Sequence, residues 1–273
     1  MPVGAYRLPR AGRDGVLVCR EGTLVRAVQA DGETALVRAW AAGGCVRFRA
    51  EASTRASASA AIDRMRFALG TDHDLRAFHR RFRRDALVGE VIRRCPWLRP
   101  RRRPEPFEAL AWAVCEQLID STRAAAIERS IVRRLGARSA CGAYRQPPTA
   151  ARLAAASPAE LDACGLAPHR SVALIRVARE VASGRANLSE HEPSWRRLLA
   201  IPDIGNWTIE MLAFEGQGRD DKLPALDLAY VMLVGRLAHG GRRATEEEVR
   251  AFFAPYGEYA ALAGLYALGH RYL

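Results

Sequence analysis

Residues 198–212 read Leu-Leu-Ala-Ile-Pro-Asp-Ile-Gly-Asn-Trp-Thr-Ile-Glu-Met-Leu, and this stretch decides the fold. The pattern predicts one helix that ends near Ala200 and a second that begins after Gly205. In the tight turn between them, free backbone N–H groups point outward beside the N-terminus of the second helix and form an anion nest. Such a turn can hold a phosphate without reading any base. An ordinary corner between two helices has the same spacing, so both interpretations stay open here.

A second polar signal lies in residues 223–230, Leu-Pro-Ala-Leu-Asp-Leu-Ala-Tyr. Asp227 stands between apolar residues, where a helix should begin. One interpretation is a helix cap, because Asp is a favoured N-cap residue. The other is a carboxylate at the mouth of a pocket, facing a positive charge that develops during a reaction. The two roles are compatible.

Composition narrows the class of partner. The chain has 273 residues, enough for one or two domains, and its 42 Lys+Arg exceed its 30 Asp+Glu to give a net charge of +12. This excess suggests a polyanionic partner, nucleic acid first. A hydrophobic fraction of 49% excludes a disordered basic tail. Arginine runs at 80–84 and 99–103 are candidate DNA-backbone contacts, with a solvated face as the alternative.

No apolar run approaches the ~18 residues of a membrane span, and the N-terminus lacks the apolar core of a signal peptide. We therefore expect a cytoplasmic protein without membrane contact. The six cysteines are scattered, the nearest pair twenty positions apart, and the six histidines have no ligand spacing. The sequence predicts neither a zinc site nor an iron–sulfur cluster.

The chain divides into an N-terminal α+β domain, residues 1–72, and a helical body, residues 73–273. Short β-branched segments at 15–19, 24–28, 35–39 and 45–48, separated by glycine turns, predict an antiparallel meander with one helix, 58–69, laid on it. Pro106 opens a helix with an apolar stripe, and capping boxes begin further helices at Ser157 and Thr245. The predicted fold class is mainly α, with a small antiparallel sheet.

Four segments, taken together, resemble the 3-methyladenine DNA glycosylase II family of the helix-hairpin-helix (HhH-GPD) DNA glycosylases. They are Pro-Phe-Glu-Ala-Leu at 106–110 leading to Glu-Gln-Leu-Ile-Asp at 116–120, Gly-Leu-Ala-Pro-His-Arg at 165–170, Ile-Pro-Asp-Ile-Gly-Asn-Trp at 201–207, and Leu-Pro-Ala-Leu-Asp-Leu at 223–228. They occur in the family's order, and the resemblance runs from about Arg76 to the C-terminus.

The resemblance implies a helical body of two lobes with a cleft between them. It also implies hydrolysis of the N-glycosidic bond of alkylated purines in duplex DNA, as in base excision repair. The protein would act as a monomer associated with the nucleoid. The target base must leave the stack first, because its bond is inaccessible in a duplex.

The resemblance also assigns site residues. Asp227 would be the catalytic carboxylate, which stabilises an oxocarbenium-like state or orients the attacking water. Gln117 and Leu118 would form the wedge that fills the gap left by the base; for Leu118 the alternative is a core leucine. The remaining assignments are a base pocket of Trp207, Met211, Leu265 and Tyr266; a phosphate-binding hairpin of Ile201, Pro202, Asp203, Ile204, Gly205 and Thr208; a DNA-backbone contact at Arg170; and a monovalent cation at the backbone carbonyls of 201–206.

Trp207 stands where bifunctional members of the superfamily carry a lysine that forms a Schiff base with the sugar. Tryptophan has no amine, and a lyase needs one. Lys222, the only lysine, lies in the loop before Asp227 instead. The sequence therefore predicts base removal without strand cleavage. An aromatic ring at this position could stack on an electron-poor alkylated purine, although a Trp packed under the hairpin is the alternative.

Several residues depart from the family pattern. Asp203 replaces the usual hairpin glycine, and Glu116 and Asp120 replace the usual Gly and Ser around Gln117, which adds negative charge near the supposed wedge. Leu265 and Met211 stand where relatives often carry aromatic residues. These changes motivate an alternative function: a lesion-binding protein on the same scaffold that performs no catalysis.

Overall fold

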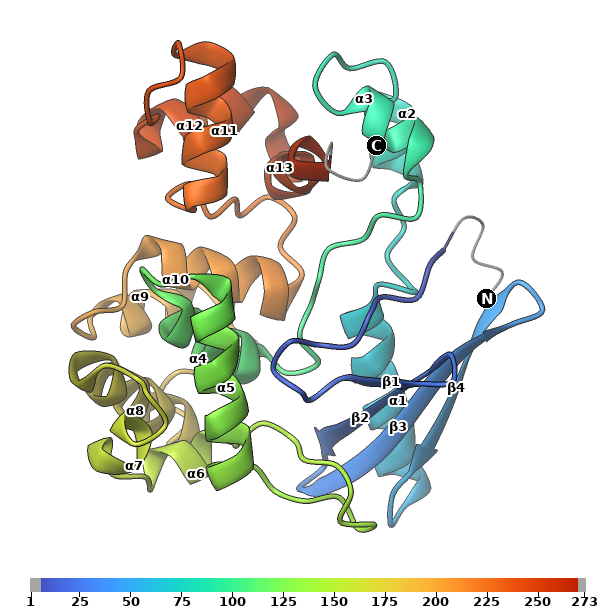
Figure 1. Ribbon diagram of the computed structural model, residues 1–273, viewed down its shortest axis with the longest axis vertical. Helices are drawn as coiled ribbons and strands as arrows, with labels where there is room; N and C mark the ends of the chain where they lie inside the picture. Colours follow the sequence, from blue (N-terminus) through green and yellow to red (C-terminus); the bar gives the residue numbers. More distant parts are fainter. Residues whose placement is uncertain (1–5, 270–273) are drawn as a thin grey trace.

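The computed structural model describes residues 6–269 and opens with a four-stranded antiparallel sheet (Figure 1). Its strands β1 (Val18–Arg20), β2 (Thr23–Ala30), β3 (Glu33–Ala42) and β4 (Cys45–Glu51) pair in chain order. Each connection is a two-residue turn with both residues at positive φ: Glu21-Gly22, Asp31-Gly32 and Gly43-Gly44. Such turns match the right-handed twist of the strands that they join, and they form the predicted meander.

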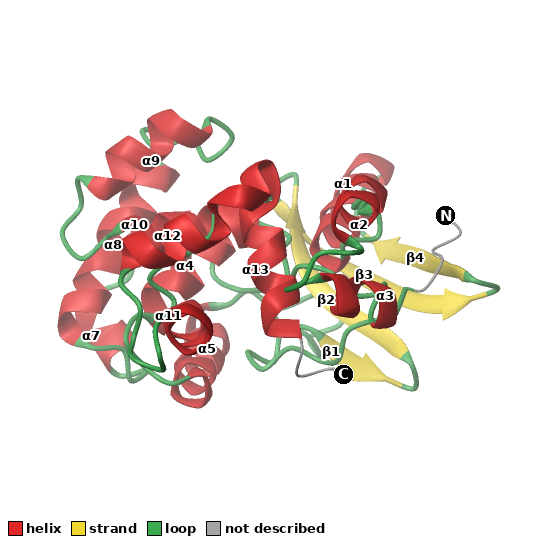
Figure 2. Ribbon diagram, turned by 90° about the horizontal axis from the view of Figure 1, so that it is seen from above, coloured by secondary structure: helices red, strands yellow, loops and turns green. Residues whose placement is uncertain are grey.

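Helix α1 (Arg55–Leu69) lies on one face of this sheet (Figure 2). The Thr54 side chain accepts a hydrogen bond from the Ser57 N–H at its start, and Gly70, in the left-handed region, ends it. Ala61, Met65 and Leu69, one turn apart, pack against the sheet. The sheet and α1 thus bury a core of their own.

The rest of the chain forms two helical lobes with separate cores (Figure 1). One holds α4 (Pro106–Glu116), α5 (Ser121–Leu135), α6 (Ala150–Ala154), α7 (Pro158–Asp162), α8 (Pro168–Ala182), α9 (His191–Leu199) and α10 (Asn206–Met211), which continues as the π-helix η1 (Leu212–Gly216). The other holds α2 (Arg76–Phe82), α3 (Gly89–Arg94), α11 (Leu228–Ala238), α12 (Glu246–Phe253), the 3₁₀ segment η2 (Ala254–Tyr259) and α13 (Ala260–Leu268). The predicted fold class, mainly helical with a small antiparallel sheet, is confirmed.

Helix α4 is held by close contact with η1. A Cβ atom added to Gly216 would lie 2.8 Å from the Cβ of Ala109 and 3.0 Å from the Cα of Pro106, so this glycine permits the contact. The same π-helical turn directs Glu215 toward Arg103, with 3.4 Å between Oε2 and Nε. The continuation of the hairpin helix thus packs directly against α4.

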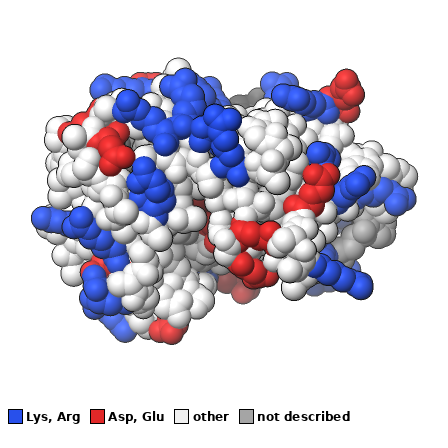
Figure 3. Space-filling view, turned by 90° about the horizontal axis from the view of Figure 1, so that it is seen from below, with Lys and Arg blue, Asp and Glu red and all other residues white. Residues whose placement is uncertain are grey.

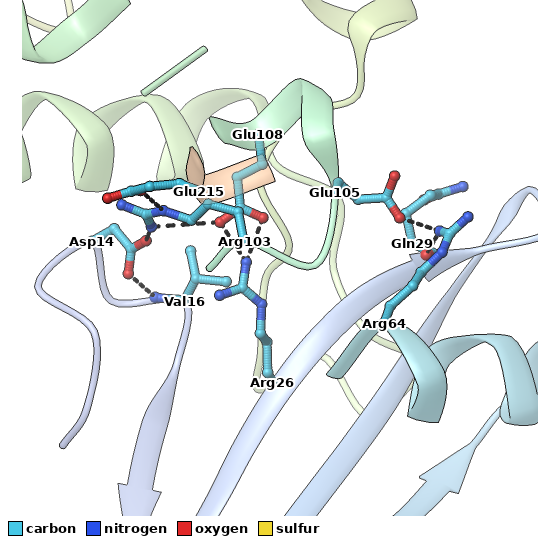
Figure 4. Close-up of polar contacts among 9 residues, drawn as sticks. All are labelled: Asp14, Val16, Arg26, Gln29, Arg64, Arg103, Glu105, Glu108 and Glu215. Atoms are coloured by element: carbon cyan, nitrogen blue, oxygen red, sulfur yellow. Dashed lines mark hydrogen bonds and ion pairs between the residues drawn. The ribbon is translucent and has the colours of Figure 1, made fainter. Parts of the chain in front are cut away.

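A buried charge network joins the sheet to the helical body (Figure 4). Glu108 of α4 is 4% exposed, and its Oε1 accepts a hydrogen bond of 2.6 Å from Nη2 of Arg26 on β2. The Arg103 Nη1 atom lies 3.5 Å from the same carboxylate and 2.8 Å from Oδ2 of Asp14. Arg103 belongs to the run 99–103, predicted as candidate DNA-backbone contacts or a solvated face, and its ion pairs make it structural instead. Arg102 is structural too, since its Nη2 lies 2.8 Å from Oδ1 of Asp220.

We predict that Glu108→Ala lowers the free energy of unfolding by about 3–5 kcal/mol, because it leaves the Arg26 guanidinium buried without its partner. Urea denaturation would measure the loss. The matched control is Glu51→Ala, which breaks the exposed Arg38–Glu51 pair and should cost less than about 1 kcal/mol. Equal losses in the two variants would contradict a structural role for the buried network.

Candidate active site

Gln117 fastens the end of α4 to the hairpin. Its Nε2 donates hydrogen bonds to the carbonyl oxygen of Asp203, at 2.8 Å, and to Oγ1 of Thr208, at 2.9 Å. An amide nitrogen has two protons, so both are used. Two segments that are more than 80 residues apart in the chain are thus brought together, and they are the expected wedge and the expected phosphate-binding turn.

Leu118 follows Gln117 and points away from the protein. Its side chain is 98% exposed and its φ is +53°. The left-handed region is unfavourable for a leucine. In addition, an exposed leucine side chain does not contribute the stabilisation that burial would give. The structure excludes the alternative of a core leucine. Strain of this kind collects at functional sites, where a side chain is held for something outside the chain.

In the hairpin, the residue at positive φ is an aspartate, and the glycine has an ordinary backbone conformation. Asp203 adopts φ +69°, which glycine would take without strain, whereas Gly205 has φ −107°, which any residue adopts. A Cβ atom at Gly205 would have no neighbour within 4 Å. Nothing inside the described chain therefore requires glycine there, and the open space faces solvent at the N-terminus of α10. Ile204 is buried beneath the turn and anchors it.

Asp227 caps α11, as one interpretation of the sequence predicted. Its Oδ1 accepts a hydrogen bond of 2.9 Å from the Ala229 N–H. The residue is half-buried, and within residues 6–269 no Lys, Arg or His nitrogen lies within 4.0 Å of its carboxylate. Leu226 and Leu228 are exposed on either side of it. The carboxylate is thus fixed by the helix N-terminus but is neither sealed in the core nor neutralised by a cation.

Glu210 ties the Asp227 loop to the hairpin helix, and no sequence pattern singles it out. Its Oε2 accepts a hydrogen bond of 3.3 Å from the Ala225 N–H, and its Oε1 lies 2.5 Å from Nη2 of Arg250 on α12. Burial raises the pKa of Glu210, an effect that Arg250 opposes. The one available signal was an acidic residue inside the apolar sequence Thr-Ile-Glu-Met-Leu. Through Glu210 and Gln117, the expected hairpin contacts both the expected wedge and the expected catalytic loop.

The other expected site residues lie in different environments. Trp207 and Met211 are half-buried on α10, and Leu265 is half-buried on α13. Tyr266 is 0% exposed, and its hydroxyl lies 3.0 Å from the Leu98 carbonyl oxygen and 2.8 Å from Nε2 of His79. This ring has no free face for a base, which corrects its assignment to the pocket.

Arg170 also needs correction. It is 8% exposed near the start of α8, and its Nε is buried without a hydrogen-bond partner. A side chain buried to this degree does not present its charge to DNA as the surface contact expected from the sequence.

The two acidic departures near the wedge have structural explanations. Asp120 caps α5 and accepts hydrogen bonds from the Arg123 and Thr122 N–H groups, which lower its pKa. Glu116 turns inward, where burial and the neighbouring Glu215 and Glu128 raise its pKa. The charge of Asp120 thus offsets a helix N-terminus, and Glu116 belongs to the buried network.

Side chains and backbone carbonyls are the two kinds of group that could hold a metal ion at this site. Within residues 6–269 no group of three His, Cys, Asp or Glu side chains is placed to hold a metal ion. The hairpin carbonyls of Ile201, Asp203 and Gly205 each accept one hydrogen bond, and a carbonyl oxygen has a second lone pair. A monovalent cation at these oxygens is compatible with the turn and stays a prediction.

Among residues 6–269, no helix is long and apolar enough to span a bilayer.

The chain was compared with protein-family models and with known proteins. No protein-family model matches the chain. It is similar to the DNA-3-methyladenine glycosylase of Bacillus subtilis, with 25% identity over 71% of this chain and 67% of the relative, and to DNA-3-methyladenine glycosylase 2 of Escherichia coli, with 30% identity over 60% and 58%. DNA-3-methyladenine glycosylase 1 of Schizosaccharomyces pombe is 32% identical over 48% of this chain. The chain thus spans about three fifths to two thirds of the length of these relatives.

Two solved structures share the fold. The 3-methyladenine DNA glycosylase of Archaeoglobus fulgidus superposes with a TM-score of 0.80 at 23% identity, covering 94% of this chain and 90% of that one. The chain therefore has the fold of the helix-hairpin-helix DNA glycosylases. The 8-oxoguanine glycosylase/lyase of Clostridium acetobutylicum, solved with double-stranded DNA, superposes with a TM-score of 0.74 at 14% identity over 94% of this chain and 87% of that one. The relatives and the shared fold support the family predicted from the four segments.

In this glycosylase-fold chain, we predict that Asp203→Asn and Asp203→Gly both tighten binding to duplex DNA by up to about five-fold, since an exposed charge interaction is worth about 0.2–1 kcal/mol. Fluorescence anisotropy at low salt would measure the change. The Asn variant keeps a residue that tolerates positive φ, so agreement between the two variants assigns the effect to charge. Gly205→Ala should weaken binding and leave the melting temperature unchanged. Weaker binding by the Asp203 variants would contradict a phosphate site at this turn.

Proposed function

We propose that this chain is a DNA glycosylase that hydrolyses the N-glycosidic bond of alkylated purines, of the 3-methyladenine type, in duplex DNA. The observation that carries the proposal is Asp227: a half-buried carboxylate without a cationic partner in the described chain, in a loop that Glu210 ties to the hairpin. The names of the three relatives support the substrate class.

The geometry suggests a division of labour. Free N–H groups at the hairpin, beside the open space at Gly205, hold a backbone phosphate. Leu118 enters the stack and occupies the gap left by the flipped base. The cationic alkylated base leaves as a neutral molecule with the electron pair of the glycosidic bond, and water adds to the sugar carbon and gives up one proton to the surrounding solvent. The Asp227 carboxylate stabilises the positive charge that develops on the sugar and orients that water.

The side chains also favour hydrolysis without strand cleavage. Lys222 Nζ lies 3.4 Å from Oδ2 of Asp221 and 5.6 Å from the centre of the Trp195 ring. The one lysine side chain of the sequence is thus engaged by Asp221 and Trp195, whereas a lyase needs a free amine to attack the sugar. Trp207, on α10, offers a ring that can stack on an electron-poor alkylated base instead.

We predict that Asp227→Asn reduces release of 3-methyladenine from methylated duplex DNA by at least about 10²-fold, because it removes the charge that stabilises the transition state. Asn keeps an oxygen that caps α11, so the melting temperature and binding to damaged DNA should remain. Chromatography of the released bases measures the first effect and anisotropy the second. Normal base release by this variant would remove Asp227 from the mechanism.

A further prediction concerns the absence of lyase chemistry. Borohydride added during turnover should trap no covalent protein–DNA adduct, and Lys222→Arg should release base at the wild-type rate. Gel electrophoresis of labelled DNA would show both results. A trapped adduct that disappears in Lys222→Arg would instead establish a glycosylase/lyase.

The alternative function is lesion binding without catalysis. It is motivated by Asp203 in the hairpin and by Tyr266, which the core withdraws from the pocket. Duplex binding with no base released from a panel of alkylated, deaminated and oxidised substrates would favour this alternative over hydrolysis.

A further inference from the structure

A large cavity outside the expected site lies between the N-terminal segment, the end of α1, the loop 97–103 and the junction of α4 with α5. Its volume is about 940 Å³, at the upper end of the range for ligand pockets. We call it the arginine cavity, because eight arginines line it: Arg7, Arg10, Arg13, Arg26, Arg99, Arg101, Arg102 and Arg103. The three acidic residues in its wall are Asp14, Glu116 and Glu128.

Most of these positive charges are not neutralised inside the protein. Arg26, Arg102 and Arg103 form ion pairs. The other five have no carboxylate within 4.0 Å among residues 6–269: they are Arg7, Arg10, Arg13, Arg99 and Arg101. On the face drawn in Figure 3, Lys and Arg side chains lie in several groups, with acidic side chains between some of them. The arginine cavity thus gathers five arginines without an ion pair within 4.0 Å in the described chain, of which Arg101 also interacts with the charge of Glu215.

Arg99 is the clearest case. Its Nη1 donates to the carbonyl oxygens of Pro96 and Leu98, and its Nε is buried without a hydrogen-bond partner. Burial lowers the pKa of Arg99, and no carboxylate compensates it. A desolvated guanidinium with an unused donor is stabilised by an incoming oxyanion.

The acidic wall opposes an anion less than its formal charge suggests. Asp14 forms an ion pair with Arg103, with 2.8 Å between Oδ2 and Nη1, and its Oδ1 accepts a hydrogen bond of 3.1 Å from the Val16 N–H. Burial raises the pKa of Glu128 to about 7, an effect that Arg103 opposes and Asp14 and Glu215 increase. It also raises the pKa of Glu116, which faces Glu128, Glu215 and Arg103. Glu128 therefore holds part of a proton near neutral pH.

The wall of the arginine cavity includes residues that are close to the wedge in the chain. Glu116 and Ser121 belong to its wall, and they flank Leu118 by two and three residues, a reach of at most about 10 Å along the chain. The Arg13 Nη1 atom donates to Oγ of Ser121 at 2.7 Å, which holds a guanidinium at this edge. On the far wall the Arg7 guanidinium lies 4.7 Å from the centre of the Trp97 ring.

We propose that the arginine cavity is a second phosphate-binding site, which holds the phosphodiester backbone of the DNA that passes the wedge. The proposal rests on the proposed function for its ligand, since duplex DNA engaged at Leu118 brings phosphates to this opening. A planar guanidinium binds a phosphate through two parallel hydrogen bonds. A free nucleotide carries the same chemistry, and the experiment separates the two sources.

The test compares Arg10→Ala/Arg13→Ala with Arg133→Ala/Arg134→Ala, a control pair that is exposed at the far end of α5 and outside the cavity wall. The affinity for an undamaged duplex is measured between about 50 and 200 mM salt. The slope of log K against log[salt] over this range reports the number of phosphate contacts. Each lost phosphate contact reduces the slope of log K against log[salt] by about 0.9, so the cavity variant should lose about 2 and the control about 0. Calorimetric titration with dAMP forms the second arm.

A reduced slope in the cavity variant alone, without dAMP binding to the wild type, supports the backbone site. Binding of dAMP that the cavity variant loses, with equal salt slopes in the two variants, supports a phosphate site for free nucleotides and overturns the DNA ligand. Equal slopes in both variants, with no dAMP binding, overturn the cavity proposal while duplex binding by the wild type sustains the proposed function. Failure of the wild type to bind duplex DNA would count against the proposed function itself.

Discussion

The buried Glu108 carboxylate is the constraint on which the arrangement of the site depends. It lies between Arg26 of the sheet and Arg103 of the loop before α4, where an unpaired charge would be strongly unfavourable. The network therefore fixes α4 against the sheet. Gln117 follows the last residue of α4, and its amide contacts Asp203 and Thr208 of the hairpin. Glu210 extends the same chain of contacts to the loop of Asp227.

In the hairpin, the strained backbone conformation and the open space belong to different residues, Asp203 and Gly205. Asp203 holds the left-handed conformation, with its carbonyl oxygen bonded to Gln117, while Gly205 leaves space that no atom of the described chain fills. Asp is among the few residues that tolerate positive φ. The geometry of the turn is thus kept while a negative charge is added beside it, a combination that tunes affinity without changing shape.

The positive charge of the chain serves two different purposes. In the run 99–103, Arg102 and Arg103 are buried and compensated by acidic residues, whereas Arg99 and Arg101 have no carboxylate partner in the described chain. Neighbouring arginines therefore differ in function according to which wall of the protein each one faces. Net charge indicates a polyanionic partner, but only the packing of the loop decides which of these charges is available to it.

Local interactions explain what the sequence by itself determined. The capping boxes at Ser157 and Thr245, the cap at Asp227 and the two-residue strand turns involve groups within a few positions of one another, so their patterns are legible in the chain. The exposure of Leu118 and the burial of Tyr266 were decided by the tertiary structure. Both are apolar or aromatic residues in apolar helical patterns, and their environments depend on partners some eighty residues away or more, such as the hairpin that fixes Gln117 and the Leu98 carbonyl that Tyr266 binds.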